Sequence, residues 1–216
     1  MVLHILSAAV VAASDSYDVS LALQRSQAAI GRPLVEVTFT DPQGRSVALA
    51  SLRGKPLIIS LVYTSCYQIC SVATSYLATV VAKARQALGS DSFNVVTIGF
   101  DTSFDTPAAM RAFANQQNIG DDNWLVLSMD RDTAALLLEN LGFSAFPSPR
   151  GYDHLVQATL VDDSGIISQQ IYGEVFDIPL LIDPLKALLL GQPLPQVPFL
   201  ERVTRRLRLV CTTYDP

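Results

Sequence analysis

Residues 57–70, LIISLVYTSCYQIC, decide the fold. The first six are almost entirely apolar and rich in branched side chains, which is typical of a central strand covered on both faces. A turn follows, and Cys66 and Cys70 stand where a helix would begin. Apolar residues repeat at helical spacing over 71–88, and Gly89 is the expected stop. The cysteine pair should therefore lie at the carboxyl end of a strand, where open α/β sheets place their sites.

The rest of the chain alternates between strand and helix patterns. Alternation over 35–39 and an apolar return at 46–49, joined by the turn residues 41–44, predict a β-hairpin before the main sheet. Residues 143–151, rich in Pro, Ser and Gly, indicate a loop. The other expected elements are strands 93–100, 124–128, 155–161 and 166–172 and helices 108–118, 133–141 and 178–190. This order predicts a mixed α/β sheet with helices on both faces.

Four segments follow one another along the chain. They are an apolar leader or export signal at 1–14, a helical segment at 15–30, the α/β domain at 31–191, and a proline-rich linker with a basic tail helix at 192–216. The leader ends in small residues, as export signals do, but has no Lys or Arg before it, so an apolar N-terminal helix is the alternative.

The tail places Leu200, Val203, Leu207 and Val210 on one helical face, away from its arginines. Its basic face is either simply solvated or in contact with an anionic membrane surface. The abrupt ending at residues 213–216 suggests that a C-terminal extension is missing.

The composition narrows the function classes. Half of the 216 residues are hydrophobic and 16% are charged, so we expect a folded core. The formal charge of −5 argues against nucleic acid as the main partner, since phosphate contacts need a basic face. Three cysteines do not make a disulfide-stapled scaffold. The distant one, Cys211, is either a small buried apolar residue or an extra thiol.

The spacing of Cys66 and Cys70 places both on one helical face over the first turn. The N–H groups and the dipole of a helix N-terminus favour thiolate over thiol. Thiolate attacks disulfides and binds soft metals, so the pair could exchange electrons with another protein's disulfide or hold Cu(I) or Zn(II). Two buried structural cysteines are the alternative.

His154 is the candidate third group, 84 residues beyond Cys70. The other of the two histidines, His4, lies in the leader. Because His154 stands between a loop and a strand, we expect it near the surface. The strand that starts at Leu155 should lie beside the central strand and carry His154 toward the cysteines. Two thiolates and one imidazole suit a trigonal Cu(I) site and leave a tetrahedral zinc site one ligand short.

These residues resemble the Sco/SenC family of copper-binding, thioredoxin-like assembly factors for cytochrome c oxidase. The similarity runs from about residue 31 to 190. The matching motifs are Tyr63–Thr64–Ser65–Cys66-x3-Cys70, residues 101–107 (DTSFDTP), and Asp153–His154 followed by a strand and an Asp-Gly-type turn. Ser71 departs from the family pattern, in which proline commonly follows the second cysteine.

The resemblance implies a thioredoxin-like fold with an added hairpin, in the bacterial periplasm or cell envelope, either membrane-anchored or soluble. It implies that Cys66, Cys70 and His154 bind Cu(I), and often Cu(II), and that the cysteine pair also cycles between dithiol and disulfide. Asp101 and Asp105 match acidic positions beside the site, with Asp153 as a further neighbour. Helix capping and loop hydrogen bonding are the alternative roles for Asp101 and Asp105.

Three functions are consistent with this pattern. The first is a metallochaperone that delivers copper to the copper A subunit of cytochrome c oxidase. The second is a thiol–disulfide reductase that reduces the target cysteines and is itself served by a thioredoxin-like reductant. The third is a copper or redox sensor. His154 favours copper, as does the lack of a proline directly before Leu155, where thioredoxins carry one; the nearest are Pro147 and Pro149.

Overall fold

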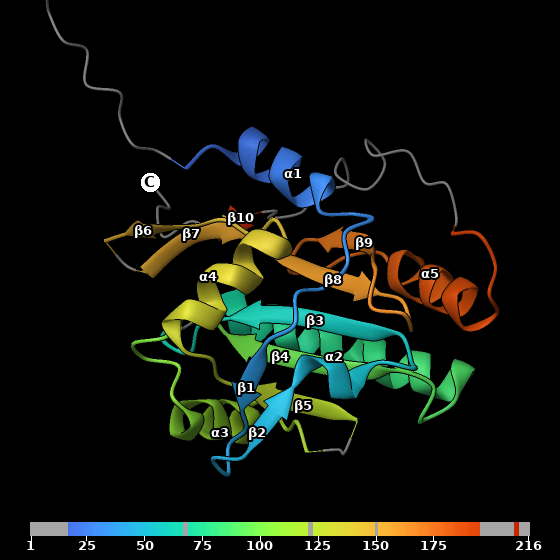
Figure 1. Ribbon diagram of the computed structural model, residues 1–216, viewed down its shortest axis with the longest axis horizontal. Coiled ribbons are helices and arrows are strands. Elements are labelled where there is room, and N and C mark those ends of the chain that lie inside the picture. The colour runs from blue at the N-terminus through green and yellow to red at the C-terminus, as the bar shows by residue number, and fades with distance from the viewer. Residues whose placement is uncertain (1–16, 67–68, 121–122, 150, 195–209, 212–216) are drawn as a thin grey trace, which may run out of the picture.

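The computed structural model describes residues 17–66, 69–120, 123–149, 151–194 and 210–211. The predicted leader and most of the predicted tail helix lie outside these residues. A central five-stranded sheet carries the fold, in the order β5-β4-β3-β8-β9 (Figure 1). Its strands are β3 (Leu57–Val62), β4 (Asn94–Gly99), β5 (Trp124–Leu127), β8 (Gln157–Val161) and β9 (Ile167–Tyr172).

The sheet is mixed, as predicted. Strands β3, β4 and β5 run parallel, whereas β8 runs antiparallel to both β3 and β9. β3 lies at the centre, and only Ser60 among its six side chains is not fully buried. An apolar strand of this kind is expected where helices cover both faces of a sheet.

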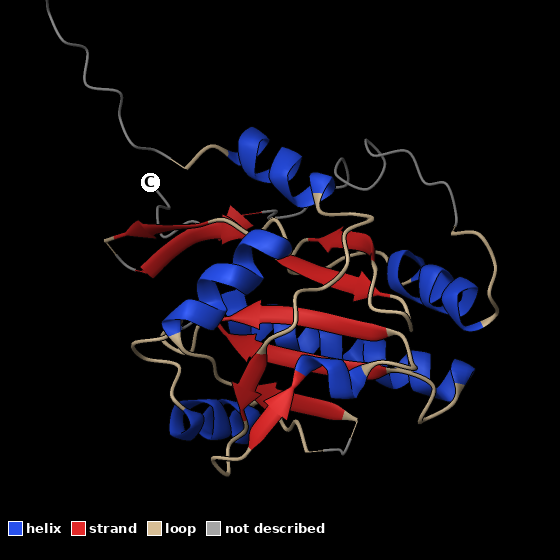
Figure 2. Ribbon diagram, in the orientation of Figure 1, coloured by secondary structure: helices blue, strands red, loops and turns tan. Residues whose placement is uncertain are grey.

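Helices cover both faces (Figures 1 and 2). Helix α2 (Ile69–Leu88) lies behind the sheet in Figure 1 and contacts α5 (Pro179–Leu189), whereas α4 (Arg131–Asn140) crosses in front. Helix α3 (Pro107–Gln116) begins with the predicted cap, because the Thr106 side chain accepts a hydrogen bond from the Ala109 N–H and Pro107 stands in the first turn. Helix α1 (Val19–Ala28) precedes the domain.

The added hairpin consists of β1 (Thr38–Thr40) and β2 (Ser46–Ala48), followed by a short 3₁₀ helix at Leu49–Leu52. Its first strand is shorter than predicted. Residues 34–37 make isolated backbone bonds instead, such as Leu34 N–H to the Gly165 carbonyl and Leu49 N–H to the Val37 carbonyl. Thr40 bridges Ser128 and ties the hairpin to the end of β5.

The prediction that residues 143–151 form a loop is wrong. It contains β6 (Ala145–Ser148), which pairs with β7 (Gly151–Leu155), and β10 (Val210–Cys211) pairs with the other edge of β7. Val210, expected at the end of a tail helix, is therefore in a strand. The predicted strand 155–161 is also divided at Val156, because Leu155 belongs to β7 and Gln157 begins β8.

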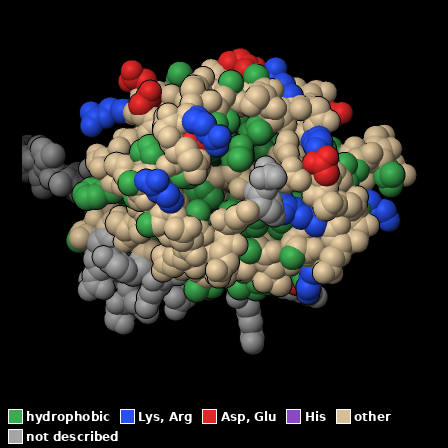
Figure 3. Space-filling view, turned by 90° about the horizontal axis from the view of Figure 1, so that it is seen from below, with side chains coloured by type: hydrophobic (Ala, Val, Ile, Leu, Met, Phe, Trp, Pro, Cys, Tyr) green, Lys and Arg blue, Asp and Glu red, His purple; other side chains and the backbone are tan. Residues whose placement is uncertain are grey.

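Charged side chains of both signs are scattered over the face shown in Figure 3, among polar and apolar ones. Within the described residues, no helix combines the length and the apolar character that crossing a lipid bilayer requires.

Candidate metal centre

The two cysteines lie between β3 and α2. Cys66 ends the turn after β3, where its N–H donates to the Tyr63 carbonyl at 3.1 Å. Cys70 is in the first turn of α2, and its N–H donates to the Cys66 sulfur at 3.5 Å. Both residues are present as thiols, Cys66 half-buried and Cys70 buried. An N–H of the helix start directed at Cys66 favours negative charge on that sulfur.

Asp105 fixes the turn that carries Cys66. One carboxylate oxygen accepts hydrogen bonds from the Thr64 N–H and the Thr64 hydroxyl, both at 2.7 Å, and the other accepts the Asp101 N–H at 2.8 Å. Burial raises the pKa of Asp105, although these hydrogen bonds favour its ionised form. Asp105 therefore joins the loop after β4 to the loop after β3.

Gly99, the last residue of β4, makes room for this carboxylate. A Cβ at Gly99 would overlap the Cβ of Asp105 and stand 2.7 Å from the sulfur of Met110. The loop hydrogen bonding that the sequence offered as one role for Asp105 is thus what Asp105 does in the structure.

His154 is buried on β7, with 2% of its surface exposed. The prediction that it lies near the surface is therefore wrong. Its ring is surrounded by aromatic side chains, with centroid distances of 5.8 Å to Tyr63, 5.4 Å to Phe100 and 5.3 Å to Phe143. The missed β6–β7 pairing explains the error, because it makes His154 part of a sheet rather than of a loop.

The environment of His154 leaves one nitrogen available. Nδ1 lies 2.8 Å from the Leu155 carbonyl, which places the proton of a neutral ring on Nδ1. Nε2 is buried and has no hydrogen-bond partner among the described residues. Burial lowers the pKa of His154, opposed in part by the Leu155 hydrogen bond and by the negative charges of Cys66 and Asp153. The ring is accordingly neutral, and the Nε2 lone pair lies in the protein interior.

Tyr152 links the histidine strand to the acidic loop. Its hydroxyl hydrogen-bonds to the Asp101 side chain, and burial, followed by the charge of Asp101, raises the pKa of Tyr152. Its ring packs edge-on against Tyr63 and Phe100, at centroid distances of 5.5 and 5.4 Å. Gly151 permits this approach, because a Cβ there would stand 2.8 Å from the Tyr63 hydroxyl. Asp101 is thus 8% exposed, and its side chain is held by a residue of β7.

The sequence-based predictions did not include the aromatic side chains around His154, although the sequence held a signal for two of them. Tyr63 and Phe100 each directly follow one of two buried parallel strands. The carboxyl ends of parallel strands meet at one edge of a sheet, so these two rings could have been expected side by side with the cysteine turn.

The structure brings the predicted residues into one region without assembling a metal cluster. Cys66 bonds to the Cys70 N–H, and its charge acts on His154. Within the described ranges, no three His, Cys, Asp or Glu side chains are grouped closely enough to hold a metal ion. The donor types still fit a soft metal, because the set offers two sulfurs and an imidazole nitrogen that has no hydrogen-bond partner among the described residues.

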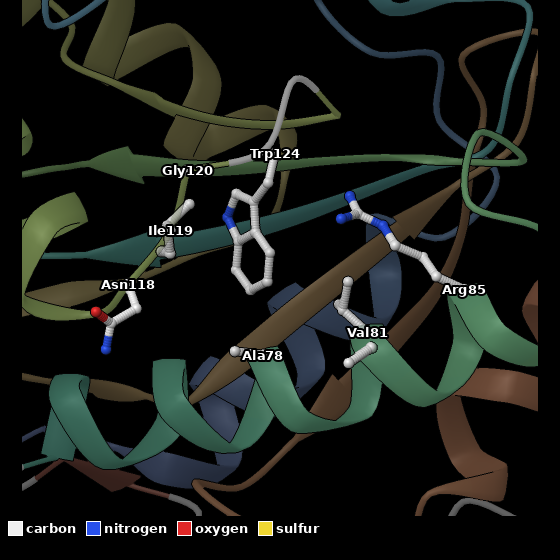
Figure 4. A pocket seen from close by; sticks show the side chains of 8 residues that line it. Ala78, Val81, Arg85, Asn118, Ile119, Gly120 and Trp124 are labelled. Carbon is white, nitrogen blue, oxygen red and sulfur yellow. The ribbon is translucent and has the colours of Figure 1, made fainter.

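A separate hollow of about 430 Å³ lies along the later turns of α2, away from the cysteines (Figure 4). Trp124 and Val81 line it, together with Arg85, which also stacks over Phe93 at 5.7 Å. None of the predicted ligands lines this hollow.

The chain is similar to known proteins. The sequence profile of the family described as SCO1/SenC matches residues 24–174. A SCO1 protein homolog of Bacillus subtilis is 29% identical over 87 residues, which are 40% of this chain and 44% of that protein. The matched part thus spans less than half of that relative.

The fold is also found among solved structures. A putative electron transfer protein of Aquifex aeolicus superposes with a TM-score of 0.70 at 24% identity, covering 76% of this chain and 95% of that one. ScoI of Bradyrhizobium japonicum, determined with copper bound, superposes with a TM-score of 0.59 at 24% identity, covering 74% and 99%. The predicted thioredoxin-like fold is confirmed.

Proposed function

Because the chain belongs to the SCO1/SenC family, we propose that it is a copper metallochaperone. Its cargo is one copper ion, bound through Cys66, Cys70 and His154 and passed to the copper A centre of cytochrome c oxidase. The place of action is the cell envelope, in keeping with the export-like leader. The copper-bound state of ScoI from Bradyrhizobium japonicum supports the choice of metal.

One observation carries the proposal, the buried Nε2 of His154. A buried nitrogen lone pair without a hydrogen bond is costly, and a metal ion is a partner that would satisfy it. The Nδ1 hydrogen bond to Leu155 selects the tautomer that a metal ligand needs, as second partners of metal-binding histidines do. A histidine serving only in packing would gain nothing from this arrangement.

The two thiolates supply the soft ligands that Cu(I) prefers. The helix start favours the thiolate of Cys66, and the turn before it is fixed through Asp105. Within the part of the chain that the structure describes, these donors are not grouped as a metal cluster, so binding requires them to move closer together. Handover then proceeds by exchange of these ligands for thiolates of the target, which must first be reduced.

A second function, reduction of the target's disulfide, is favoured by the unequal exposure of the two cysteines. Cys66 is half-buried and can meet an incoming disulfide, whereas the buried Cys70 is placed to resolve the mixed disulfide. In that reaction two electrons and two protons pass from the Cys66–Cys70 dithiol to the target disulfide. The two functions use the same residues and are compatible.

The test is an anaerobic Cu(I) titration of the reduced protein against a competing chelator. Wild type should bind about one copper per chain, and His154→Ala should lower the affinity about tenfold or more. His4→Ala, which removes the other histidine, serves as the matched control and should bind like wild type.

Equal affinities of wild type and His154→Ala would show that the three-ligand site is wrong. If wild type binds no copper, yet converts the disulfide of an oxidised copper A domain to thiols, the chain is a reductase rather than a carrier.

A further inference from the structure

A buried hydroxyl group lies one helical turn beyond the second cysteine of the pair. Thr74 belongs to α2 and is 1% exposed. Its Oγ1 has no hydrogen-bond partner among the residues that the structure describes. A buried hydroxyl without a partner destabilises a fold, because it loses its hydrogen bonds to water and gains none in return. The presence of Thr74 at this position therefore calls for an explanation.

The usual partner of a threonine in a helix is not used by Thr74. Such hydroxyls commonly bond to the carbonyl four residues earlier. Thr79 does so on the same helix, since its hydroxyl donates to the Ser75 carbonyl at 3.2 Å. Within the described part of the chain, Thr74 does not make the corresponding bond to the Cys70 carbonyl. Its hydroxyl is therefore available to another acceptor.

The acceptor that the helix geometry offers is the sulfur of Cys70. Residues four apart lie on one face of a helix, and their side chains lean toward the helix N-terminus, so the Thr74 side chain leans toward Cys70. Both residues are on the buried face of α2. A thiol sulfur is a weak acceptor, whereas a negatively charged sulfur accepts strong hydrogen bonds. A Cys70 sulfur that carries negative charge thus supplies the partner that the hydroxyl lacks.

We propose that Thr74 is a positioning residue of the copper site, whose hydroxyl donates a hydrogen bond to the Cys70 sulfur when that sulfur binds copper. This inference rests on the proposed function and deepens it. The ligand movement that copper binding requires brings the sulfur within reach of the hydroxyl. Thr74 does not touch the metal, but it orients one ligand and draws electron density from its sulfur, as hydrogen-bond partners of metal ligands do.

The hydrogen bond has a consequence for the oxidation state of the cargo. Hydrogen bonds around a copper-bound cysteine sulfur tune the redox potential of the metal. A donor at the sulfur reduces the electron density that the thiolate gives to copper, and Cu(II), the more electron-poor ion, loses more by this than Cu(I). The Thr74 hydroxyl therefore raises the reduction potential of bound copper and favours Cu(I).

Two substitutions separate the hydroxyl of Thr74 from its methyl group. Thr74→Val keeps nearly the same shape without the hydroxyl, and it should lower the Cu(I) affinity about tenfold and lower the reduction potential of bound copper. Thr74→Ser keeps the hydroxyl and should stay close to wild type in both. Competition with a chelator measures the affinity, and an electrochemical titration followed by absorption measures the potential. The matched control is Thr79→Val, which removes the exposed hydroxyl bonded to Ser75 and should change neither.

Unfolding of the reduced, metal-free protein gives a readout of the opposite sign. Thr74→Val has no hydrogen bond to lose there, so its free energy of unfolding should equal or exceed that of wild type. Thr74→Ser should be less stable than wild type, because it loses a buried methyl group. The variant that folds best would then be the one that binds copper worst, which shows that Thr74→Val loses affinity without losing its fold.

A residue that acts only by packing gives the reverse pattern, with copper bound as in wild type by Thr74→Val and more weakly by Thr74→Ser. That pattern, or equal losses of affinity in the two variants, would overturn the inference. The proposed function would still stand if His154→Ala weakens binding. A wild type that binds no copper would remove both.

Discussion

Asp105 shows how much of the candidate site depends on one side chain outside the proposed ligand set. Both carboxylate oxygens are used, two hydrogen bonds going to Thr64 and one to the Asp101 N–H. The resemblance placed Asp105 beside the candidate site, but the sequence could not choose between a role at that site and helix capping or loop hydrogen bonding. That choice depends on where Thr64 lies, which is a tertiary fact.

Replacing Asp105 by Ala should lower the free energy of unfolding by about 2–4 kcal/mol, because the buried Asp101 N–H and the partly buried N–H and hydroxyl of Thr64 lose their acceptor. The gain from no longer burying a carboxylate offsets part of this cost. Urea unfolding measures the change, and Asp132→Ala, an exposed carboxylate in the first turn of α4, is the control. A loss no larger than that of the control would mean that the Asp105 hydrogen bonds do not hold the loop.

His154 shows a second limit of prediction at the scale of single residues. The sequence singled out His154 as the candidate third group but did not predict its burial. Ala145–Ser148 contains Pro147 and lies between other turn-forming residues, so it has the composition of a loop. It forms a strand because β6 is at a sheet edge, where a missing N–H is tolerated.

At the scale of elements, the start of α2 governs the cysteine pair. The helix begins at Ile69, so Ser71 is in its first turn, where backbone N–H groups have no partner within the helix. The apolar repeat over 71–88 predicted this helix well, since eighteen residues with one apolar face leave little ambiguity. The departure at Ser71 from the family's proline can therefore be tested directly.

Ser71→Pro should leave both the unfolding free energy and copper affinity close to wild type, because proline is accepted in the first turn. Thr79→Pro, an exposed position further along α2, should cost about 3 kcal/mol or more through a lost hydrogen bond and a clash. Thermal unfolding and the Cu(I) titration check both variants. Equal losses in the two would show that α2 starts earlier than residue 69.

At the scale of the whole molecule, the order of alternating strands and helices was enough to predict the central sheet. It also predicted that the strand after His154 lies beside β3, which is confirmed by the β3–β8 pairing. The small sheet of β6, β7 and β10 could not be predicted, because its strands are short and one of them comes from the distant C-terminal segment. Such pairings depend on the packed domain rather than on local pattern.

The buried histidine should make the metal-free molecule sensitive to acid. Burial holds the pKa of His154 below its ordinary value of 6.5, so the unfolded chain binds this proton first as the pH falls. Stability is therefore full above 6.5 and declines below it, by at most about 1.4 kcal/mol per pH unit for one group. Urea unfolding at pH 7 and pH 5 measures the decline, which should be smaller in His154→Gln. The same decline in that variant would assign the acid sensitivity to other groups.

The antiparallel pairing of β3 and β8 determines where the protein can accept insertions during evolution. Cys66 follows β3 and His154 precedes β8, so both stand at the same edge of the sheet, however long the chain between them is. The turn at Gly89–Ser92, after the far end of α2, lies at the opposite edge. Insertions accumulating there over evolution would lengthen the protein without displacing Cys66 or His154, whereas a single residue added between Val62 and Cys66 would displace Cys66.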